Sequence, residues 1–287
     1  MTIVEDLKED PNTLLLVQTT QFGTIKSISN VLKNTTNDFG LRFDESGIHL
    51  ISVEANDIVA TIDMFLDRSK FDEYMVKNYI EFSVYPEYFF KTIKSFRNDS
   101  MITFYIQKEE DEEDDMWHTL QILNQQNKYD YGTIQKLAVH DVGPRLENRN
   151  YPPYDVRIIA NCESSQGTTI QEIIKQQKVT ETSFVQFEYI DSYFIIKSEG
   201  NVFDSITTCT KGNDTIVDIQ HPNNNSENSN GPISGKYNLN FLESAFKSSE
   251  MSKKVHIEMR NNYPLRIIFS AGVLGDIKFT LVEKEEN

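Results

Sequence analysis

The sequence is poor in cysteine, and its apolar runs are short. Cys162 and Cys209 are the only cysteines among 287 residues, and neither belongs to a CxxC pair or to a Cys/His spacing. This argues against a disulfide framework and a structural zinc site, and it favours a reducing compartment. The longest apolar runs, such as 14–17, are too short to cross a bilayer. The acidic first ten residues contain no apolar segment of a secretory signal, so we expect neither secretion nor a membrane partner.

The sequence also lacks the short motifs that mark nucleotide-dependent or hydrolytic enzymes. It contains no GxxxxGK, no GxGxxG before a helix and no GxSxG, and its five histidines are scattered. We therefore predict a protein that is not an enzyme, with no catalytic residues, no cofactor and no metal site.

A run of seven acids, 109–115, allows a competing hypothesis. Adjacent carboxylates repel one another, which favours a solvated hairpin tip. The alternative is a metal-binding patch in an enzyme that cleaves nucleic acid. Loss of a divalent-dependent nuclease activity on deletion of 109–115 would support that alternative.

Positive charge is scarce. Asp and Glu number 44 against 28 Lys and Arg, which gives a formal net charge of -16. This balance argues against indiscriminate binding to nucleic acids or membranes, but it leaves room for a locally basic surface.

Two secondary-structure patterns alternate along the chain. Period-2 alternation, as in 101–107, predicts antiparallel strands with one buried face. Helical periodicity marks four segments: Phe22–Asn34, Pro86–Arg97, Gly167–Lys178 and Tyr237–Ser248. Each half then reads strand, helix, strands, helix, strands, which indicates an internal duplication of architecture. We predict an α+β fold with two similar domains, 1–136 and 155–287, joined by a Pro- and Gly-containing connector, 137–154.

The helices carry polar and basic side chains opposite their apolar sides. These are Lys26, Asn30 and Lys33 in the first helix, Lys91, Lys94 and Arg97 in the second, Lys175 and Lys178 in the third, and Lys247 in the fourth. Such faces are ordinary for amphipathic helices at a surface. The outward faces of the first two helices, however, are expected to hold no acid, and this favours contact with phosphates without sequence specificity. The third and fourth helices mix Glu with Lys.

Three segments resemble a known family. They are 41–64, which reads as a hairpin with a short polar tip, the basic helix 88–99, and the C-terminal part from 237 to 284, with its Tyr-Pro-Leu step at 263–265 and its Gly-X-X-Lys step at 275–278. Together they resemble the proliferating cell nuclear antigen (PCNA) family of DNA sliding clamps. The resemblance extends over roughly 14–284 and is diffuse in the third quarter.

The resemblance implies a DNA clamp fold, with two helices packed on antiparallel sheet in each domain. Three subunits would form a homotrimeric ring whose helices line the hole. Such a ring encircles duplex DNA, serves as a DNA polymerase processivity factor, and tethers clamp loader, replication and DNA repair proteins in the nucleus, or at a cytoplasmic replication site if the chain is viral. Edge strands would pair between subunits through Trp117, Thr119 and Gln121 on one side and Phe203, Ile206 and Thr208 on the other.

The resemblance also implies a pocket for short hydrophobic motifs of client proteins. The matching residues are Val53, Asp57, Ile58, Pro264, Leu281 and Val282, with Val139, Leu146 and Tyr151 added from the connector. Strand residues such as Val53 and Ile58 are equally typical of core packing. Leu146 and Tyr151 lie in a Pro-rich loop, which favours an exposed apolar contact.

The sequence departs from the family pattern at several positions. Glu172 and Asn240 stand where the family commonly has a base, and about a dozen N-terminal residues are additional. An alternative role follows: a subunit of a heterotrimeric checkpoint-type clamp, or a degenerate clamp acting as a scaffold or transcription subunit.

Overall fold

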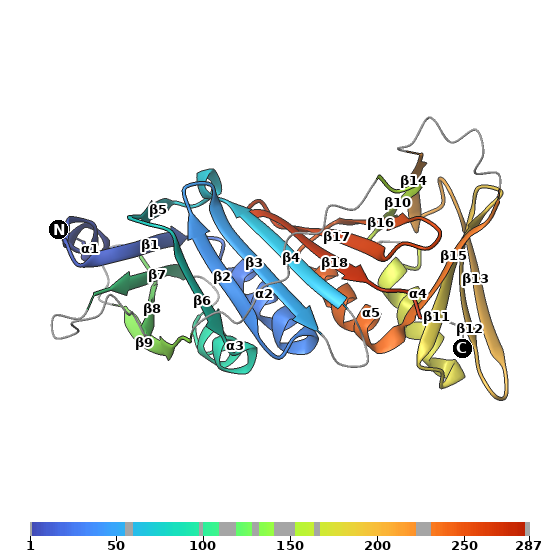
Figure 1. The fold of residues 1–287 in the computed structure, drawn as a ribbon, viewed down its shortest axis with the longest axis horizontal. Helices are drawn as coiled ribbons and strands as arrows, with labels where there is room; N and C mark the ends of the chain where they lie inside the picture. Colours follow the sequence, from blue (N-terminus) through green and yellow to red (C-terminus); the bar gives the residue numbers. More distant parts are fainter. Residues whose placement is uncertain are drawn as a thin grey trace. The chain divides into compact units, whose positions relative to one another are not determined.

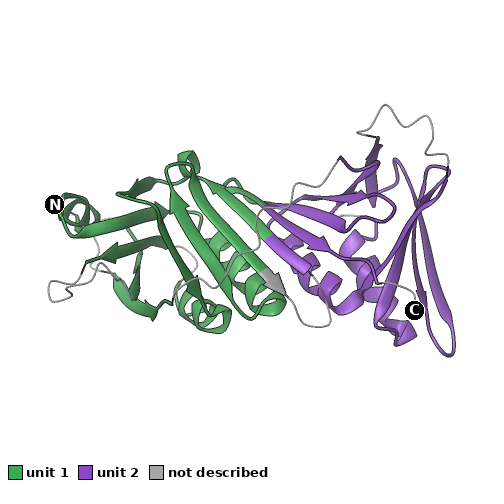
Figure 2. Cartoon of the chain, in the orientation of Figure 1, with its two compact units in different colours: residues 1–52, 63–145, 271–276 green, residues 53–62, 146–270, 277–287 purple. Residues whose placement is uncertain are grey.

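The computed structural model of the chain describes residues 2–54, 60–97, 100–108, 119–127, 132–140, 153–163, 167–221 and 231–284 (Figure 1). Two compact units are present (Figure 2). Unit 1 comprises 1–52, 63–145 and 271–276, and unit 2 comprises 53–62, 146–270 and 277–287. The predicted connector at 137–154 divides the chain into two continuous domains. In the structure, 53–62 also belongs to unit 2 and 271–276 to unit 1.

The first part of the chain, up to residue 140, holds three α-helices and nine strands among its described residues. They are α1 (Ile3–Glu9), β1 (Thr13–Thr19), α2 (Phe22–Thr35), β2 (Phe39–Asp44), β3 (Gly47–Glu54), β4 (Ala60–Asp67), β5 (Glu73–Val76), β6 (Ile80–Val84), α3 (Pro86–Lys94), β7 (Met101–Gln107), β8 (Thr119–Gln125) and β9 (Thr133–Ala138). In unit 1 one sheet has the order β5-β1-β7-β8-β9, and β4, β3, β2 and β6 are neighbours in another.

The second part repeats this order. Its elements are β10 (Val156–Asn161), α4 (Ile170–Gln176), β11 (Phe184–Ile190), β12 (Tyr193–Glu199), β13 (Asp204–Thr210), β14 (Ile216–Gln220), β15 (Ile233–Asn238), α5 (Leu239–Phe246), β16 (Lys254–Met259), β17 (Leu265–Ala271) and β18 (Gly275–Leu281). In unit 2 one sheet has the order β13-β12-β11-β15, and β14, β10, β16, β17 and β18 are neighbours in another. Apart from α1, both parts read strand, helix, five strands, helix, three strands, so the predicted duplication and α+β class are confirmed.

The predicted helices form, but their ends differ. Helix α4 begins at Ile170 rather than Gly167, because Thr169 is its N-cap and accepts from the Glu172 N–H. Helix α5 begins at Leu239, because Asn238 is both the last residue of β15 and the N-cap. Short 3-10 turns continue both helices, over Gln177–Thr180 and Lys247–Glu250.

Helix α1 was not predicted. Its N-terminus carries a capping box, in which the Thr2 hydroxyl accepts from the Glu5 N–H and the Glu5 carboxylate accepts from the Thr2 N–H. Val4 and Leu7 of this helix pack with Leu16, Tyr105 and Leu123 on β1, β7 and β8. The sequence signal was therefore the Thr-x-x-Glu pattern at residues 2–5, together with two apolar residues, Val4 and Leu7, three positions apart.

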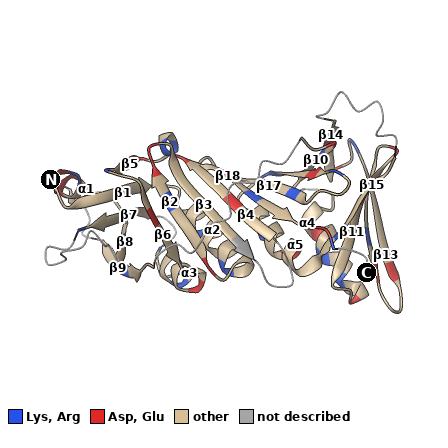
Figure 3. Cartoon of the chain, viewed as in Figure 1, with Lys and Arg blue, Asp and Glu red and all other residues tan. Residues whose placement is uncertain are grey.

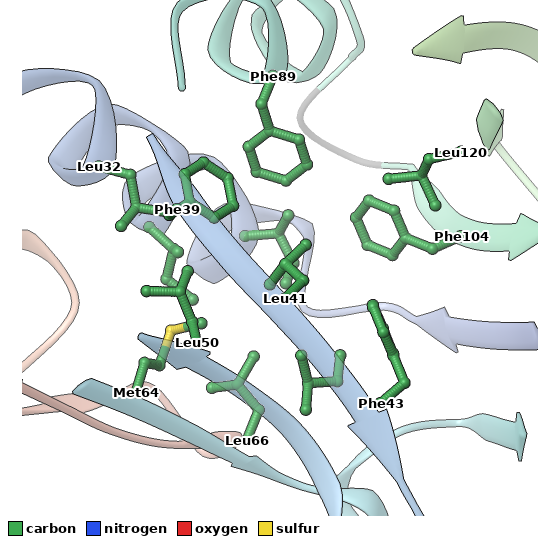
Figure 4. A pocket seen from close by; sticks show the side chains of 13 residues that line it. Leu32, Phe39, Leu41, Phe43, Leu50, Met64, Leu66, Phe89, Phe104 and Leu120 are labelled. Atoms are coloured by element: carbon green, nitrogen blue, oxygen red, sulfur yellow. The ribbon is translucent and has the colours of Figure 1, made fainter. Parts of the chain in front are cut away.

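The core of unit 1 lies where α2, α3 and the two sheets meet. Side chains from all of these elements surround a cavity of about 40 Å³ (Figure 4). Leu32, Phe39 and Phe89 are among its lining residues, and every lining side chain is apolar. A water there would find no polar partner, so the cavity is a gap in core packing rather than a polar ligand site.

The core of unit 2 is held by edge-to-face aromatic contacts. Phe246 of α5 lies 5.5 Å from Phe269 of β17, and Phe241 lies 6.3 Å from Phe279 of β18, measured between ring centroids. These contacts fix the apolar side of α5 on the sheet and leave its polar side outward.

The structure explains why glycine stands at the first position of the Gly-X-X-Lys pattern, residue 275. A Cβ at this position would lie 1.9 Å from the Phe65 carbonyl oxygen, so only glycine permits this close approach.

Candidate nucleic-acid interface

Helices α2 and α3 pack side by side in unit 1 and form a basic wall. Their apolar sides, with Ile28 and Ile93 among the buried residues, point into the core. Lys33, Lys91 and Lys94 are exposed on the outward side, and Lys26 and Asn30 are partly exposed. Arg97 is exposed just beyond the end of α3. The structure thus brings together the six residues predicted on these helices.

An acid lies on this wall, contrary to expectation. The Glu87 carboxylate lies 3.3 Å from Lys33 Nζ and 3.2 Å from Lys91 Nζ. Hydrogen bonds from Lys91 and then from Lys33 hold the pKa of Glu87 below its ordinary value. Blue and red lie together on α3 in Figure 3. The prediction of an acid-free face was wrong, because Glu87 lies one turn before Lys91 on α3 and faces α2 across the helix pair.

Aromatic rings position the lysines of the wall. Lys33 and Lys94 lie over the Phe90 ring, with Nζ 4.6 Å and 5.6 Å from its centroid. Lys91 Nζ lies 5.8 Å from the Tyr88 centroid. Contacts of this kind hold an ammonium group in place while it remains able to meet an anion.

The helices of unit 2 carry a more neutral face. Lys178 forms an ion pair with Glu243, which joins the turn after α4 to α5. Lys175 is exposed, Lys247 is partly exposed, and Asn240 is exposed. Glu172 completes the capping box of α4: its carboxylate accepts from the Thr169 N–H at 2.8 Å, and this bond comes first among the causes that lower its pKa. The acid at this position therefore has a local structural role.

Two strands were expected to lie at sheet edges and to pair between subunits, and the first of them does not lie at an edge. The segment 117–123 was expected at an edge. Its described part lies in β8, and β9 pairs with β8 along its length, for example Gln121 with Lys136. Thr119 and Gln121 are therefore on an inner strand, and that prediction was wrong; Trp117 lies outside the described residues. The edge strand on this side of the sheet is β9, where Ile134 is 48% exposed.

The other edge agrees with expectation. Strand β13 is the outer strand of the sheet β13-β12-β11-β15. Ile206 on this strand is 65% exposed, and Phe203 just before it is 47% exposed. Thr208 is also exposed. Apolar side chains on an open edge indicate a surface suited to pairing with another chain.

The predicted client pocket is described only in part. Leu281 is 1% exposed and Val139 is 8% exposed, so both are buried in the single chain, and their role as contact residues stays a prediction. Pro264 is partly exposed and Val282 is 44% exposed. The Val53 side chain and Asp57, Ile58, Leu146 and Tyr151 lie outside the described residues.

The part of the chain that the structure describes contains neither a cluster of metal-ligating groups nor a reactive thiol. No group of three or more His, Cys, Asp or Glu residues there is placed to hold a metal ion. Burial raises the pKa of the Cys162 thiol to about 12 and also raises that of Cys209, which keeps both thiols protonated at neutral pH. The acidic run 109–115 lies outside the described residues. None of the described helices has the length and apolarity needed to span a membrane.

The chain is similar in sequence to known proteins. Residues 14–142 match the family model of the proliferating cell nuclear antigen N-terminal domain. The chain is 24% identical over 277 residues to a probable DNA polymerase sliding clamp 1 of Paramecium bursaria Chlorella virus 1, with 95% of this chain and 98% of the relative covered.

Two solved structures agree over nearly the whole chain. One is the proliferating cellular nuclear antigen of Entamoeba histolytica, with a TM-score of 0.79, 15% identity, and 95% of this chain and 100% of the other covered. The other is PCNA of Thermococcus kodakaraensis, with a TM-score of 0.77, 16% identity, and coverage of 94% and 100%. These likenesses establish the fold of both parts of the chain.

Proposed function

We propose that this chain, which belongs to the proliferating cell nuclear antigen family, is a DNA sliding clamp: a non-enzymatic ring that encircles duplex DNA and raises the processivity of a DNA polymerase. The observation that carries the proposal is the repeated architecture, in which each part presents two helices with outward lysines. A ring built from such parts is acidic outside and more basic within, so a net charge of -16 does not conflict with DNA in its hole.

Three copies form the ring, head to tail, with β9 of one subunit beside β13 of the next. This pairing is supported by the open edges of both strands, since edge strands leave backbone donors and acceptors unpaired. Ile134 and Ile206, both strongly exposed in the single chain, would be buried by it.

The wall of α2 and α3 contacts phosphates through Lys33, Lys91, Lys94 and Arg97, while Lys175, Lys178 and Lys247 contribute from unit 2. Glu87 and Glu243 each share the charge of a lysine, which keeps the contacts weak. Weak, non-specific contacts suit a ring that moves along the duplex.

Client proteins, among them the polymerase and the clamp loader, bind through short hydrophobic motifs to a pocket that includes Pro264 and Val282. Val53, Asp57, Ile58, Leu146 and Tyr151 complete the pocket. The protein acts where DNA is replicated and repaired, in the nucleus or at a cytoplasmic replication site.

Two measurements on the full chain test the proposal. Size-exclusion chromatography with light scattering should give the mass of a trimer, and addition of the protein and a clamp loader should lengthen polymerase products on primed circular DNA. A monomer at all accessible concentrations together with no effect on product length would refute it. A pure chain that assembles into trimers also counts against a heterotrimeric checkpoint-type clamp.

A charge-reversal pair tests the wall itself. The double variant Lys91→Glu/Lys94→Glu should fold and shorten the products, because both side chains point away from the core. The control Lys70→Glu/Lys253→Glu makes the same charge change at exposed positions outside α2, α3, α4 and α5 and should leave product length unchanged. Equal activity of both variants would show that α3 does not face DNA.

A further inference from the structure

Three rings gather where α3 begins in unit 1. Tyr85 is the N-cap residue of α3, and its ring is stacked on that of His140, with centroids 4.5 Å apart and planes at 25°. Tyr88 meets Tyr85 edge to face at 6.3 Å. We call Tyr85, Tyr88 and His140 the aromatic patch.

The patch is open to solvent. Tyr85 is 52% exposed and Tyr88 is 58% exposed, although buried Phe89 lies beside them on the same helix. His140 stacks on the Tyr85 ring, yet about half of the residue remains exposed, so Tyr85 is accessible to a flat partner. The core is filled by Phe89 and Ile93, so folding alone does not require the two tyrosines.

The patch adjoins cations of the α2–α3 wall. Lys91 Nζ lies 5.8 Å from the Tyr88 centroid, and Lys94 follows one turn later on α3. Aromatic rings interleaved with lysines on one surface are the arrangement that binds single-stranded nucleic acid: the bases stack on the rings, and the cations contact the phosphates.

We propose that the aromatic patch stacks unpaired bases of single-stranded DNA beside α3. The inference rests on the proposed function, because it places DNA against this helix. A base is the fitting occupant because it is flat, as the stacked Tyr85–His140 pair requires, and because its phosphate supplies the negative charge that Lys91 and Lys94 complement. The ring pair is held in a parallel stack before binding, so little side-chain freedom is lost when a base joins it.

Because of the charges around the patch, stacking should contribute more than ionic attraction to the binding of single-stranded DNA there. Asp38 lies 3.4 Å from His140 Nε2, and Glu87 pairs with Lys91. These acids reduce the positive potential at the rings. Binding of bases here should therefore depend less on salt than binding of duplex DNA to the lysines.

The experiment compares three fluorescently labelled 20-nucleotide probes by anisotropy: oligo(dT), an abasic strand with the same phosphates, and a duplex. Wild-type protein should bind oligo(dT) more tightly than the abasic strand. The variant Tyr85→Ala/Tyr88→Ala should weaken oligo(dT) binding by about fivefold or more, the loss expected for one stacked base. It should leave the abasic strand and the duplex unchanged.

Matched variants control the comparison. Tyr85→Phe/Tyr88→Phe keeps both rings and should keep oligo(dT) affinity. Tyr79→Ala removes a tyrosine that is also 58% exposed but lies before β6, away from the start of α3, and should have no effect. Thermal unfolding of each variant checks that it folds.

Several outcomes would overturn the inference: equal wild-type affinity for oligo(dT) and the abasic strand, no binding of either, or an equal loss in Tyr79→Ala. Loss of polymerase capture by Tyr85→Ala/Tyr88→Ala with oligo(dT) affinity intact would assign the patch to a protein partner instead. The proposed function is judged separately, by trimer mass and by product length on primed circular DNA.

Discussion

Glu87 should restrain DNA binding, and its replacement by Gln should strengthen it. The carboxylate accepts contacts from Lys33 at 3.3 Å and from Lys91 at 3.2 Å. Glu87→Gln keeps the size of the side chain and removes its charge. Lys33 remains over the Phe90 ring, so it keeps its position on the wall and becomes available to a phosphate.

The size of the effect follows from counterion release. Each lysine that gains a phosphate contact steepens the plot of log affinity against log salt by about 0.9, so one or two lysines give about 0.9 to 1.8 for each subunit that touches the DNA. A fourfold rise in KCl should then cost the variant roughly 3- to 12-fold more affinity than it costs wild type. The variant should bind more tightly at low salt, and the difference should fade at high salt.

The assay is anisotropy of a labelled 30-base-pair duplex titrated with protein between 50 and 200 mM KCl. Glu73→Gln is the matched control, because it removes the same charge away from the α2–α3 wall. Glu73 lies on β5 and forms an ion pair with Lys8 of α1. An unchanged salt slope in Glu87→Gln, or the same gain in Glu73→Gln, would refute the idea that Glu87 withholds lysines from DNA.

Three further predictions concern stability. Glu258→Ala should lower the free energy of unfolding by about 2–3 kcal/mol in urea denaturation, because this 1%-exposed carboxylate bridges Arg157 and Arg266; a loss under about 1 kcal/mol would contradict this. Leu7→Ala should lower the free energy of unfolding by about 2 kcal/mol and make residues 1–12 sensitive to protease. Glu9→Ala, at an exposed position of the same helix, should do neither. Glu172→Gln should lower the melting temperature at neutral pH. The lowered pKa of Glu172 means that its contribution is lost as pH falls below 4.5, so the two proteins should then melt alike; a constant difference would exclude the ionised cap.

Local patterns predicted most of the fold correctly. The four helices of the repeated architecture and the duplication itself follow from periodicity, because burial of one face imposes a period of 3.6 or 2 on the sequence wherever an element lies. Gly275 was noted only through the family resemblance, and the tertiary contact with the Phe65 carbonyl explains why glycine stands there. Helix α1 carried its capping signal in residues 2–5, although it is too short for periodicity alone to identify it.

Most of the errors concern partners distant in the chain, although the Glu87–Lys91 pair, four positions apart on one helix, was readable from the sequence. Nothing near Glu87 in the sequence indicates that Lys33, more than fifty positions earlier, shares its carboxylate. Thr119 and Gln121 alternate as edge residues do, and only the hydrogen-bonded register of β9 against β8 places them inside the sheet. Val139 and Leu281 are apolar at positions consistent with a pocket, and only the tertiary structure shows that both side chains are buried.

The sequence by itself determined the four helices of the repeated architecture, that this architecture occurs twice, and that the helices carry lysine on the side opposite the core. The tertiary structure decided which of those lysines are shared with an acid, which strands end a sheet, and that Tyr85 and Tyr88 meet His140 at the start of α3. The physical reason is that local periodicity arises from the burial of each element's own face, whereas ion pairs, sheet edges and ring stacks arise from contacts between elements that only folding brings together.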